Sequence, residues 1–409
     1  MTQVQFNFLK LWLSDAAYAA ASALSTGSVL SAFLLYRGLA EGQIAAYLSV
    51  TQFVNLAVSL LFAGAASTVR DTRRPLLRLS AVSGGLIFMH VVFCLPSMRI
   101  GLTYALILIL GCMQAAVTAL RTIYIYKLPC EVMDLRHFSV YAGYQGLFIG
   151  AAGIGVGLLL PLFFARFSFM AVSGFAFAAA GMMIALSGWC LWTLHPMEKD
   201  GCSEQTPTEP RGGLQTFFDD LRRLISNREF RELLLPNILR GFGGALINMF
   251  AVLAFRDGIL REETASLITA ATYIGTLLSC FAYVFCVKHI GIPKTCLFGG
   301  VLFCLICFSL SGGSIPCVVL YAIAYIGYNM VCCAIPDLIY RSVPYDLISI
   351  FQTWRLAMTQ LGVVLASAVY SLMVACVEGY LLLLIGTVGY VLCAFGYYFY
   401  FRKHPEFKK

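Results

Sequence analysis

Long apolar stretches that carry almost no charge constrain this chain more than any other feature of its sequence. Of its 409 residues, 60% are hydrophobic and 12% are charged, whereas about 25% of a soluble globular protein is charged. A helix of about 20 apolar residues spans the ~30 Å of hydrocarbon in a bilayer. The stretches lack the alternation that marks the strands of a membrane barrel. They therefore predict an all-α integral membrane protein.

Twelve such stretches predict twelve transmembrane helices. The first is too long for a signal-peptide core and leads directly into the second, so we expect it to be retained. The expected spans are residues 13–36, 43–66, 76–96, 102–125, 139–164, 168–195, 232–255, 264–287, 294–312, 315–340, 347–376 and 379–401.

Basic residues predict the orientation of these spans. With both termini in the cytoplasm, most of the 28 Lys and Arg lie in cytoplasmic segments, which is the positive-inside pattern. The formal net charge of +8 therefore reflects membrane topology, and we expect no nucleic-acid partner. The basic residues left on the outer side are Arg37, Arg99, Arg166, Arg256 and Arg261.

A hydrophilic segment divides the spans six and six. It predicts an N-terminal six-helix bundle (1–196), a cytoplasmic linker (197–231) and a C-terminal six-helix bundle (232–409). Within the linker, residues 214–225 place apolar side chains on one helical face. This pattern predicts an amphipathic helix, either on the membrane surface or packed on cytosolic loops.

The two halves also repeat weakly. A shift of 220 residues places the loop 71–74 on 291–294, and a shift of 210 places Gln145 on Arg355. Because six spans separate the copies, both cross the membrane in the same direction. Parallel six-span repeats with a substrate site at their interface are a known transporter design.

The loop after the second span, "GAASTVRDTRRPLL" from Gly64, combines a short turn with a basic cluster. Together with twelve spans around a central linker, it makes the chain resemble the major facilitator superfamily over nearly its whole length. Gly64 and Arg73 match the family pattern, whereas Thr68 and Asp71 stand where the family has an aspartate and a second glycine. The resemblance implies two pseudo-symmetric bundles that transport a solute by alternating access.

The resemblance further implies a cytoplasmic gate in this loop and its counterpart in the second half. The departure at Thr68 argues against the family's usual charge relay. The arginines could instead neutralise the dipole at the C-terminal end of a neighbouring helix, or simply keep the loop in the cytoplasm. The expected gate residues are Gly64, Arg70, Asp71, Arg73, Arg74, Gly291 and Lys294.

Glycines crowd the fifth span, in "GLFIGAAGIGVG". Drug–proton exchangers of the same superfamily often carry a proline there, and this chain has Ala151 at that position. Spacings near four residues favour close helix packing in any membrane protein, and we prefer that reading. The glycines are Gly146, Gly150, Gly153, Gly155 and Gly157.

Two arginines lie deep inside spans. Arg240 and Arg355 each come about nine residues after the start of the seventh and eleventh spans, or roughly 13 Å at 1.5 Å per residue. Intramembrane arginines are expensive, and a guanidinium suits bidentate binding of a carboxylate or phosphate. We therefore favour anion recognition. The alternatives are an ion pair with Asp15 or Asp337, or a snorkelling role like that expected for Arg121.

Other polar residues extend this candidate site. Asn237 shares a helical face with Arg240. Asp15 is the one acid clearly inside the spans of the first half. Burial favours its protonated form and a nearby arginine favours its charged form, so Asp15 could couple transport to protons or belong to a static lock. The remaining candidate ligands are Asn248, Gln145, Tyr144 and Trp354.

We therefore expect a secondary active transporter, a permease for a small anionic or zwitterionic solute, coupled to protons as a symporter or antiporter. We expect it to work as a monomer in the cytoplasmic (inner) membrane of a bacterium. No phosphate-binding loop, cofactor motif or complete metal motif accompanies the 15 cysteines. The alternatives are a multidrug or metabolite efflux antiporter and a membrane-embedded lipid-modifying enzyme, whose best catalytic candidates are Glu131, Asp134 and His137.

Overall fold

The computed structural model describes a protein built of helices. It describes residues 3–62, 69, 71–95, 100–132, 138–196, 218–219, 222–223, 225–261, 265–342, 348–374 and 376–404. Most of the predicted linker, including its amphipathic helix, lies outside these residues. The elements are α1 (Gln3–Ser25), α2 (Gly27–Tyr36), α3 (Glu41–Leu61), α4 (Arg73–Met89), η1 (His90–Cys94), α5 (Ile100–Val132), α6 (Phe138–Phe164), α7 (Phe169–Trp192), α9 (Arg228–Arg256), α10 (Ala265–Phe303), η4 (Cys304–Ser311), α11 (Ser314–Ser342), α12 (Ile348–Met373) and α13 (Gly379–Lys403).

Helices long and apolar enough to cross a bilayer occur 11 times among the described residues. One of these stretches, Ser266–Ser311, has 46 residues, and Gly291 interrupts it with a φ of 79°. Glycine populates this left-handed region readily because it has no Cβ. The stretch therefore contains two spans. The prediction of an all-α protein with twelve spans, and of a turn at Gly291, is confirmed.

The first predicted span differs from the structure in two respects. Its helix starts at Gln3, ten residues before the predicted start of the span. It also breaks at Thr26 and Gly27, where Gly27 has a φ of 57°, so that α1 and α2 follow one another as two helices. The polar start of α1 is anchored by Asn7, whose side chain bonds the backbone of Val132 and His195.

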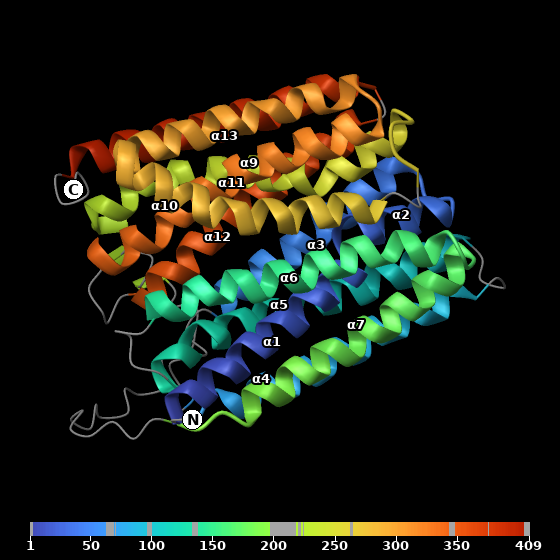
Figure 1. The fold of residues 1–409 in the computed structure, drawn as a ribbon, viewed down its shortest axis with the longest axis horizontal. Helices are drawn as coiled ribbons and strands as arrows, with labels where there is room; N and C mark the ends of the chain where they lie inside the picture. Colours follow the sequence, from blue (N-terminus) through green and yellow to red (C-terminus); the bar gives the residue numbers. More distant parts are fainter. Residues whose placement is uncertain are drawn as a thin grey trace.

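The helices run along the long axis of the molecule, and both chain ends lie at the same end of it (Figure 1). Helices α1 to α7 occupy the lower part of this view and α9 to α13 the upper part. The two groups pack on each other along two seams, where α3 meets α12 and α6 meets α10. Each bundle supplies one of its helices to each seam.

The seam between α6 and α10 depends on the glycines of the fifth span. A Cβ added at Gly157 would lie 2.6 Å from the backbone nitrogen of Ala270, and one at Gly153 would lie 2.1 Å from the Tyr273 ring. Gly150 and Gly146 face α10 less tightly, because their Cβ atoms would lie 3.2 Å from Leu277 and 3.5 Å from the sulfur of Cys280, whereas nothing lies within 4 Å of a Cβ at Gly155. The preferred reading of these glycines as packing residues is confirmed for the four that face α10.

We predict opposite effects for alanine at two neighbouring glycines of α6. Gly157→Ala should destabilise the protein by about 1–3 kcal/mol, because its Cβ overpacks the backbone of α10. Gly155→Ala serves as the control and should be neutral or slightly stabilising, because alanine favours the helix by about 1 kcal/mol. Melting temperatures of the purified variants test this. Equal melting temperatures for the two would contradict the packing argument.

Candidate functional site

Arg240 is buried in the middle of α9, with 7% of its surface exposed. Its Nη2 donates a hydrogen bond of 2.7 Å to Oγ1 of Thr359 on α12. Its Nη1 lies 4.0 Å from the sulfur of Cys332 on α11, and its Nε has no hydrogen-bond partner among the described atoms. The guanidinium therefore keeps a buried donor that no described group of the protein satisfies.

The bond between Arg240 and Thr359 requires α9 and α12 to approach closely. A Cβ added at Gly362 would lie 1.9 Å from the carbonyl oxygen of Ile238, and one at Gly241 would lie 2.3 Å from that of Thr359. Helix α9 runs without interruption from Arg228 to Arg256, and Gly241 lets it pack closely against α12.

Arg355 lies one helical turn before Thr359 on α12 and is 8% exposed. Its Nε and Nη2 donate to Oε1 of Gln352 at 3.1 and 2.9 Å, which fixes the orientation of the guanidinium. Thr359 in turn donates to the carbonyl oxygen of Arg355 at 3.1 Å. The two arginines predicted from the sequence therefore come together, with Thr359 between them. Arg355 is also within electrostatic range of Arg240 and of Tyr126 on α5.

Neither arginine has an acidic partner among the side chains that the structure describes. The described ion pairs leave out both Arg240 and Arg355. Asp15, predicted as one candidate partner, accepts a hydrogen bond of 2.9 Å from Nε2 of Gln145, so these two predicted residues of the first bundle lie together. Asp337, the other candidate, lies on α11, and its side chain is outside the described part.

The other predicted ligands are scattered. Asn237 is 3% exposed and bonded within the second bundle, because it donates to the carbonyl of Leu233 and accepts from the hydroxyl of Tyr397 at 2.9 Å. Trp354 is 3% exposed within the apolar core. Tyr144 is half exposed and packs its ring against Trp12 on α1, at 5.2 Å between centroids. Asn248 is half-buried two turns beyond Arg240.

Arg121 does not reach the surface as expected. It is 5% exposed and donates to the hydroxyls of Ser80 and Ser187 at 3.3 and 3.1 Å. Its guanidinium also lies over the ring of Tyr18, 4.1 Å from the centroid. These contacts join α5 to α4, α7 and α1, so Arg121 fastens the interior of the first bundle.

Asp71 and Arg73, two of the predicted gate residues, hold the first bundle together. Asp71 pairs with Nε of Arg73 at 2.8 Å, and this hydrogen bond lowers the pKa of the Asp71 carboxyl. Arg73 also donates to the carbonyl of Leu194, just beyond α7, as Lys10 does to that of Thr193. The arginine thus neutralises a helix C-terminus, one of the roles expected from the sequence. Gly64 and Arg70 lie outside the described residues.

Glu131, the first of the catalytic candidates for an enzyme, has a structural role. Glu131 accepts hydrogen bonds from the backbone and hydroxyl of Thr72, at 3.1 and 2.7 Å, and it pairs with Lys127. It therefore ties the loop before α4 to the end of α5. Asp134 and His137, its expected companions, lie outside the described part of the chain.

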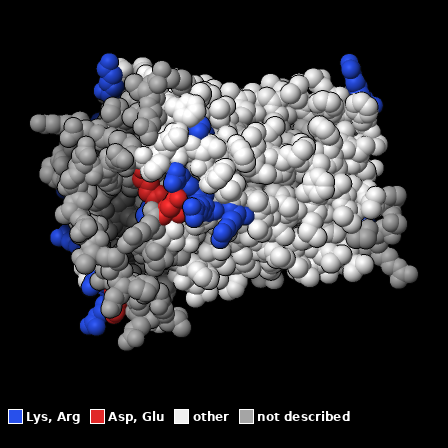
Figure 2. Space-filling model, turned by 90° about the horizontal axis from the view of Figure 1, so that it is seen from below, with Lys and Arg blue, Asp and Glu red and all other residues white. Residues whose placement is uncertain are grey.

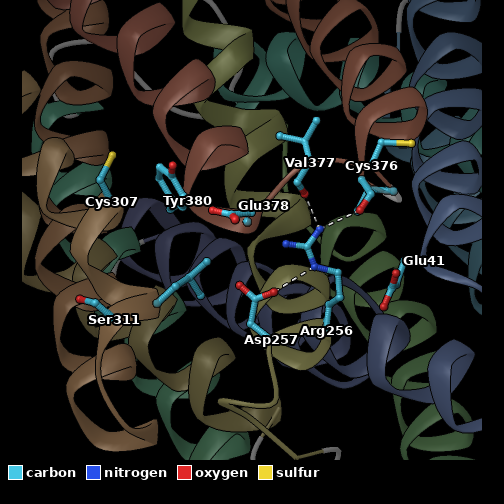
Figure 3. Close-up of a pocket in the computed structure, with 12 residues that line it drawn as sticks. Glu41, Arg256, Asp257, Cys307, Ser311, Cys376, Val377, Glu378 and Tyr380 are labelled. Atoms are coloured by element: carbon cyan, nitrogen blue, oxygen red, sulfur yellow. Dashed lines mark hydrogen bonds and ion pairs between the residues drawn. The ribbon is translucent and has the colours of Figure 1, made fainter.

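A cavity of about 700 Å³ opens at the C-terminal end of α9 (Figure 3), and this end of the helix lies opposite the chain termini (Figure 1). Arg256 pairs there with Asp257 at 2.9 Å and donates to the carbonyls of Val374 and Val377. It thereby binds the end of α9 to the corner between α12 and α13. Glu41, the cavity residue from the first bundle, completes the wall. None of the predicted substrate ligands lines this cavity.

Sequence reasoning missed the groups that position the arginine pair. Thr359 and Gln352 lie four residues after and three residues before Arg355, so helical spacing could have found them. Cys332 and Tyr397 belong to other helices, and no spacing in the sequence connects them to Arg240.

Comparisons with known proteins agree on the fold. A family described as MFS/sugar transport protein matches residues 13–346, a range that includes Arg240 and ends before Arg355. No curated protein matches the chain. Several solved structures, each under 25% identical, share its fold. One is xylose transporter XylE from E. coli in a partially occluded, inward-open conformation, with a TM-score of 0.71 and 13% identity over 96% of this chain and 97% of that one. Another is nucleoside transporter NupG, with a TM-score of 0.60 and 16% identity over 98% of this chain and 100% of that one. A third is a bacterial homologue of the human lysosomal transporter Spinster, inward-facing and unoccupied, with a TM-score of 0.67 and 14% identity over 100% of this chain and 99% of that one.

We predict that the hydroxyl of Thr359 stabilises the buried arginine. Thr359→Val should cost about 1.5–3 kcal/mol, the typical value of a hydrogen bond to a charged group, because it leaves Nη2 of Arg240 without an acceptor. Thr359→Ser keeps the hydroxyl and should cost less. Chemical or thermal unfolding of the two variants measures the difference. If valine and serine destabilise equally, the hydroxyl does not support Arg240.

Proposed function

The chain belongs to the MFS/sugar transport protein family. We propose that this secondary transporter moves a small anionic or zwitterionic solute by alternating access and that transport is coupled to protons. One observation carries the choice of substrate. Arg240 and Arg355 lie together in the membrane interior with no described carboxylate nearby, and Arg240 keeps an unsatisfied Nε.

A buried cation with no counter-ion among the described side chains favours an anionic ligand. Hydroxyl and amide oxygens solvate the two guanidinium groups only in part, and moving a charge out of water costs several kcal/mol unless it is paired. A carboxylate or phosphate that reaches the pair receives charge-assisted hydrogen bonds, the strongest kind that side chains offer. Arg355 is the better placed to meet a ligand between the bundles, because Tyr126 of the other bundle lies within its electrostatic range.

The proton site of this proposal is Asp15. Its carboxylate accepts a hydrogen bond from Gln145, which joins α1 to α6. Protonation of Asp15 removes the negative charge of the carboxylate that accepts this hydrogen bond. Because α6 forms a seam with α10 of the other bundle, a change at Asp15 acts next to the surface along which the bundles must slide. The bundles move as the units 1–196 and 232–409 in this mechanism, and the cytoplasmic gate lies at the ends of α3 and α4.

The alternatives differ in how well the observations support them. The matched family and the similar structures are transporters, which fits the expectation that the chain is not an enzyme. Among those structures, one protein is a xylose transporter and another a nucleoside transporter. A neutral sugar or nucleoside is therefore the main competing substrate, and an efflux antiporter for drugs is the next.

We predict that acids raise the melting temperature of the purified protein and that Arg240→Ala removes this shift, because binding to the native state stabilises it by mass action. The screen uses acetate, succinate, glutamate, inorganic phosphate, xylose and uridine. Arg166→Ala, which removes an exposed arginine far from the site, is the control and should keep the shift. If xylose or uridine alone stabilises the protein, the proposed substrate class is wrong.

We predict that Asp15→Asn separates transport from proton coupling. In proteoliposomes, the variant should still exchange the acid that the screen identifies, because exchange needs no net proton movement. It should lose accumulation driven by a pH gradient. Asp257→Asn, which changes an acid at the opposite end of the molecule, should keep both activities. Gradient-driven accumulation that survives in Asp15→Asn would exclude Asp15 as the coupling residue.

A further inference from the structure

The lipid-facing stripe of α4 begins with two arginines. Arg74 and Arg78 are exposed, and the exposed positions continue along the same side of the helix through Val82 and Phe88 to Met89. These last three side chains are 51%, 53% and 51% exposed, so this side meets hydrocarbon. The opposite side, with Ser80, packs into the bundle. The two guanidinium groups therefore stand where the apolar band of the protein ends.

The helix direction turns these side chains toward the membrane surface. Helical side chains lean toward the N-terminus of their helix, and α4 begins at the end of the molecule that carries both chain termini. Arg78 starts about 6–8 Å inside the first residue of α4, a distance that a long arginine covers by snorkelling. Both guanidinium groups can therefore reach the level of the lipid headgroups.

The acids that the structure describes near this pair are bound to other groups. Asp71 lies within electrostatic range of Arg74, but it binds Arg73 with both carboxylate oxygens, and Glu131 binds Thr72 and Lys127. No described ion pair includes Arg74 or Arg78. Seen from below, Lys and Arg with a few acids gather toward the end with the termini, and a wide uncharged surface follows (Figure 2).

Two like charges four residues apart on a helix repel each other, so an anion between them is favoured. We propose that Arg74 and Arg78 form a binding site for the phosphate of an anionic phospholipid, whose acyl chains lie along the exposed apolar stripe of α4. The phosphate satisfies both guanidinium groups through charge-assisted hydrogen bonds. The acyl chains cover Val82 and Phe88, which free inorganic phosphate cannot do.

The second half of the chain provides a matched control. Lys294 is the counterpart of Arg74 in the 220-residue repeat, and it is also exposed at the start of a lipid-facing stripe. The counterpart of Arg78 is Phe298, which is 43% exposed. At the two positions equivalent to Arg74 and Arg78, α10 thus has one cation where α4 has two. A site that needs the pair should be present on α4 and absent at Lys294.

The test measures the melting temperature of the protein in a neutral detergent with added lipid. Dioleoyl-phosphatidylglycerol should raise it by several degrees, whereas dioleoyl-phosphatidylcholine should not, and any shift with inorganic phosphate should be the same in the wild type and in Arg74→Gln/Arg78→Gln. The double variant Arg74→Gln/Arg78→Gln should lose most of the shift, and Lys294→Gln should keep it. Native mass spectrometry should show fewer bound phosphatidylglycerol molecules on the double variant only.

Three results would overturn the proposal. The first is an equal shift with phosphatidylcholine, which would mean that any lipid covers the stripe. The second is a shift that survives in the double variant, or disappears equally in Lys294→Gln, which would make the pair irrelevant. The third is a full shift with inorganic phosphate that the double variant loses, which would identify an anion site at this pair without a lipid. Native mass spectrometry decides the outcome if the double variant has a lower starting melting temperature.

Discussion

The absence of water inside a bilayer is the constraint on which the whole structure depends. A backbone that crosses hydrocarbon must satisfy its own hydrogen bonds, so each span is a helix, and each break needs a local reason. Here the breaks lie at glycines with positive φ, Gly27 and Gly291. The same constraint makes every intramembrane charge conspicuous, because each one must find partners within the protein or in a ligand.

Close helix packing is the second feature that shapes the molecule. Lipid tails are as apolar as leucine, so helices associate through close contact and polar bonds more than through hydrophobic burial. Glycines supply that contact both between the two bundles and beside the arginine pair. Gly157 and Gly153 bring α6 against α10 across the two bundles, and Gly241 and Gly362 bring α9 against α12 beside the arginine pair.

Much of this could be predicted from the sequence. The all-α membrane class, the twelve spans and the arginines at matching depth follow from apolar length and helical rise, which are local properties. Arg121 shows the limit of such reasoning. Its position near the inner end of a span suggested snorkelling, but Ser80, Ser187 and Tyr18, on three other helices, hold it inside the bundle. Asn237 likewise bonds to Leu233 and Tyr397, and the contact with Tyr397 on another helix could not be read from its own helix.

The sequence by itself thus determined how many times the chain crosses the membrane and which charged residues lie inside the spans, where burial of a charge is unfavourable. Both depend on the composition of single helices. Only the tertiary structure decided which of those charges share an environment. Arg240 meets Thr359 across 119 positions of sequence, and Asp15 meets Gln145 across 130, because helices distant in sequence pack side by side. Residue spacing within one helix carries no information about such contacts.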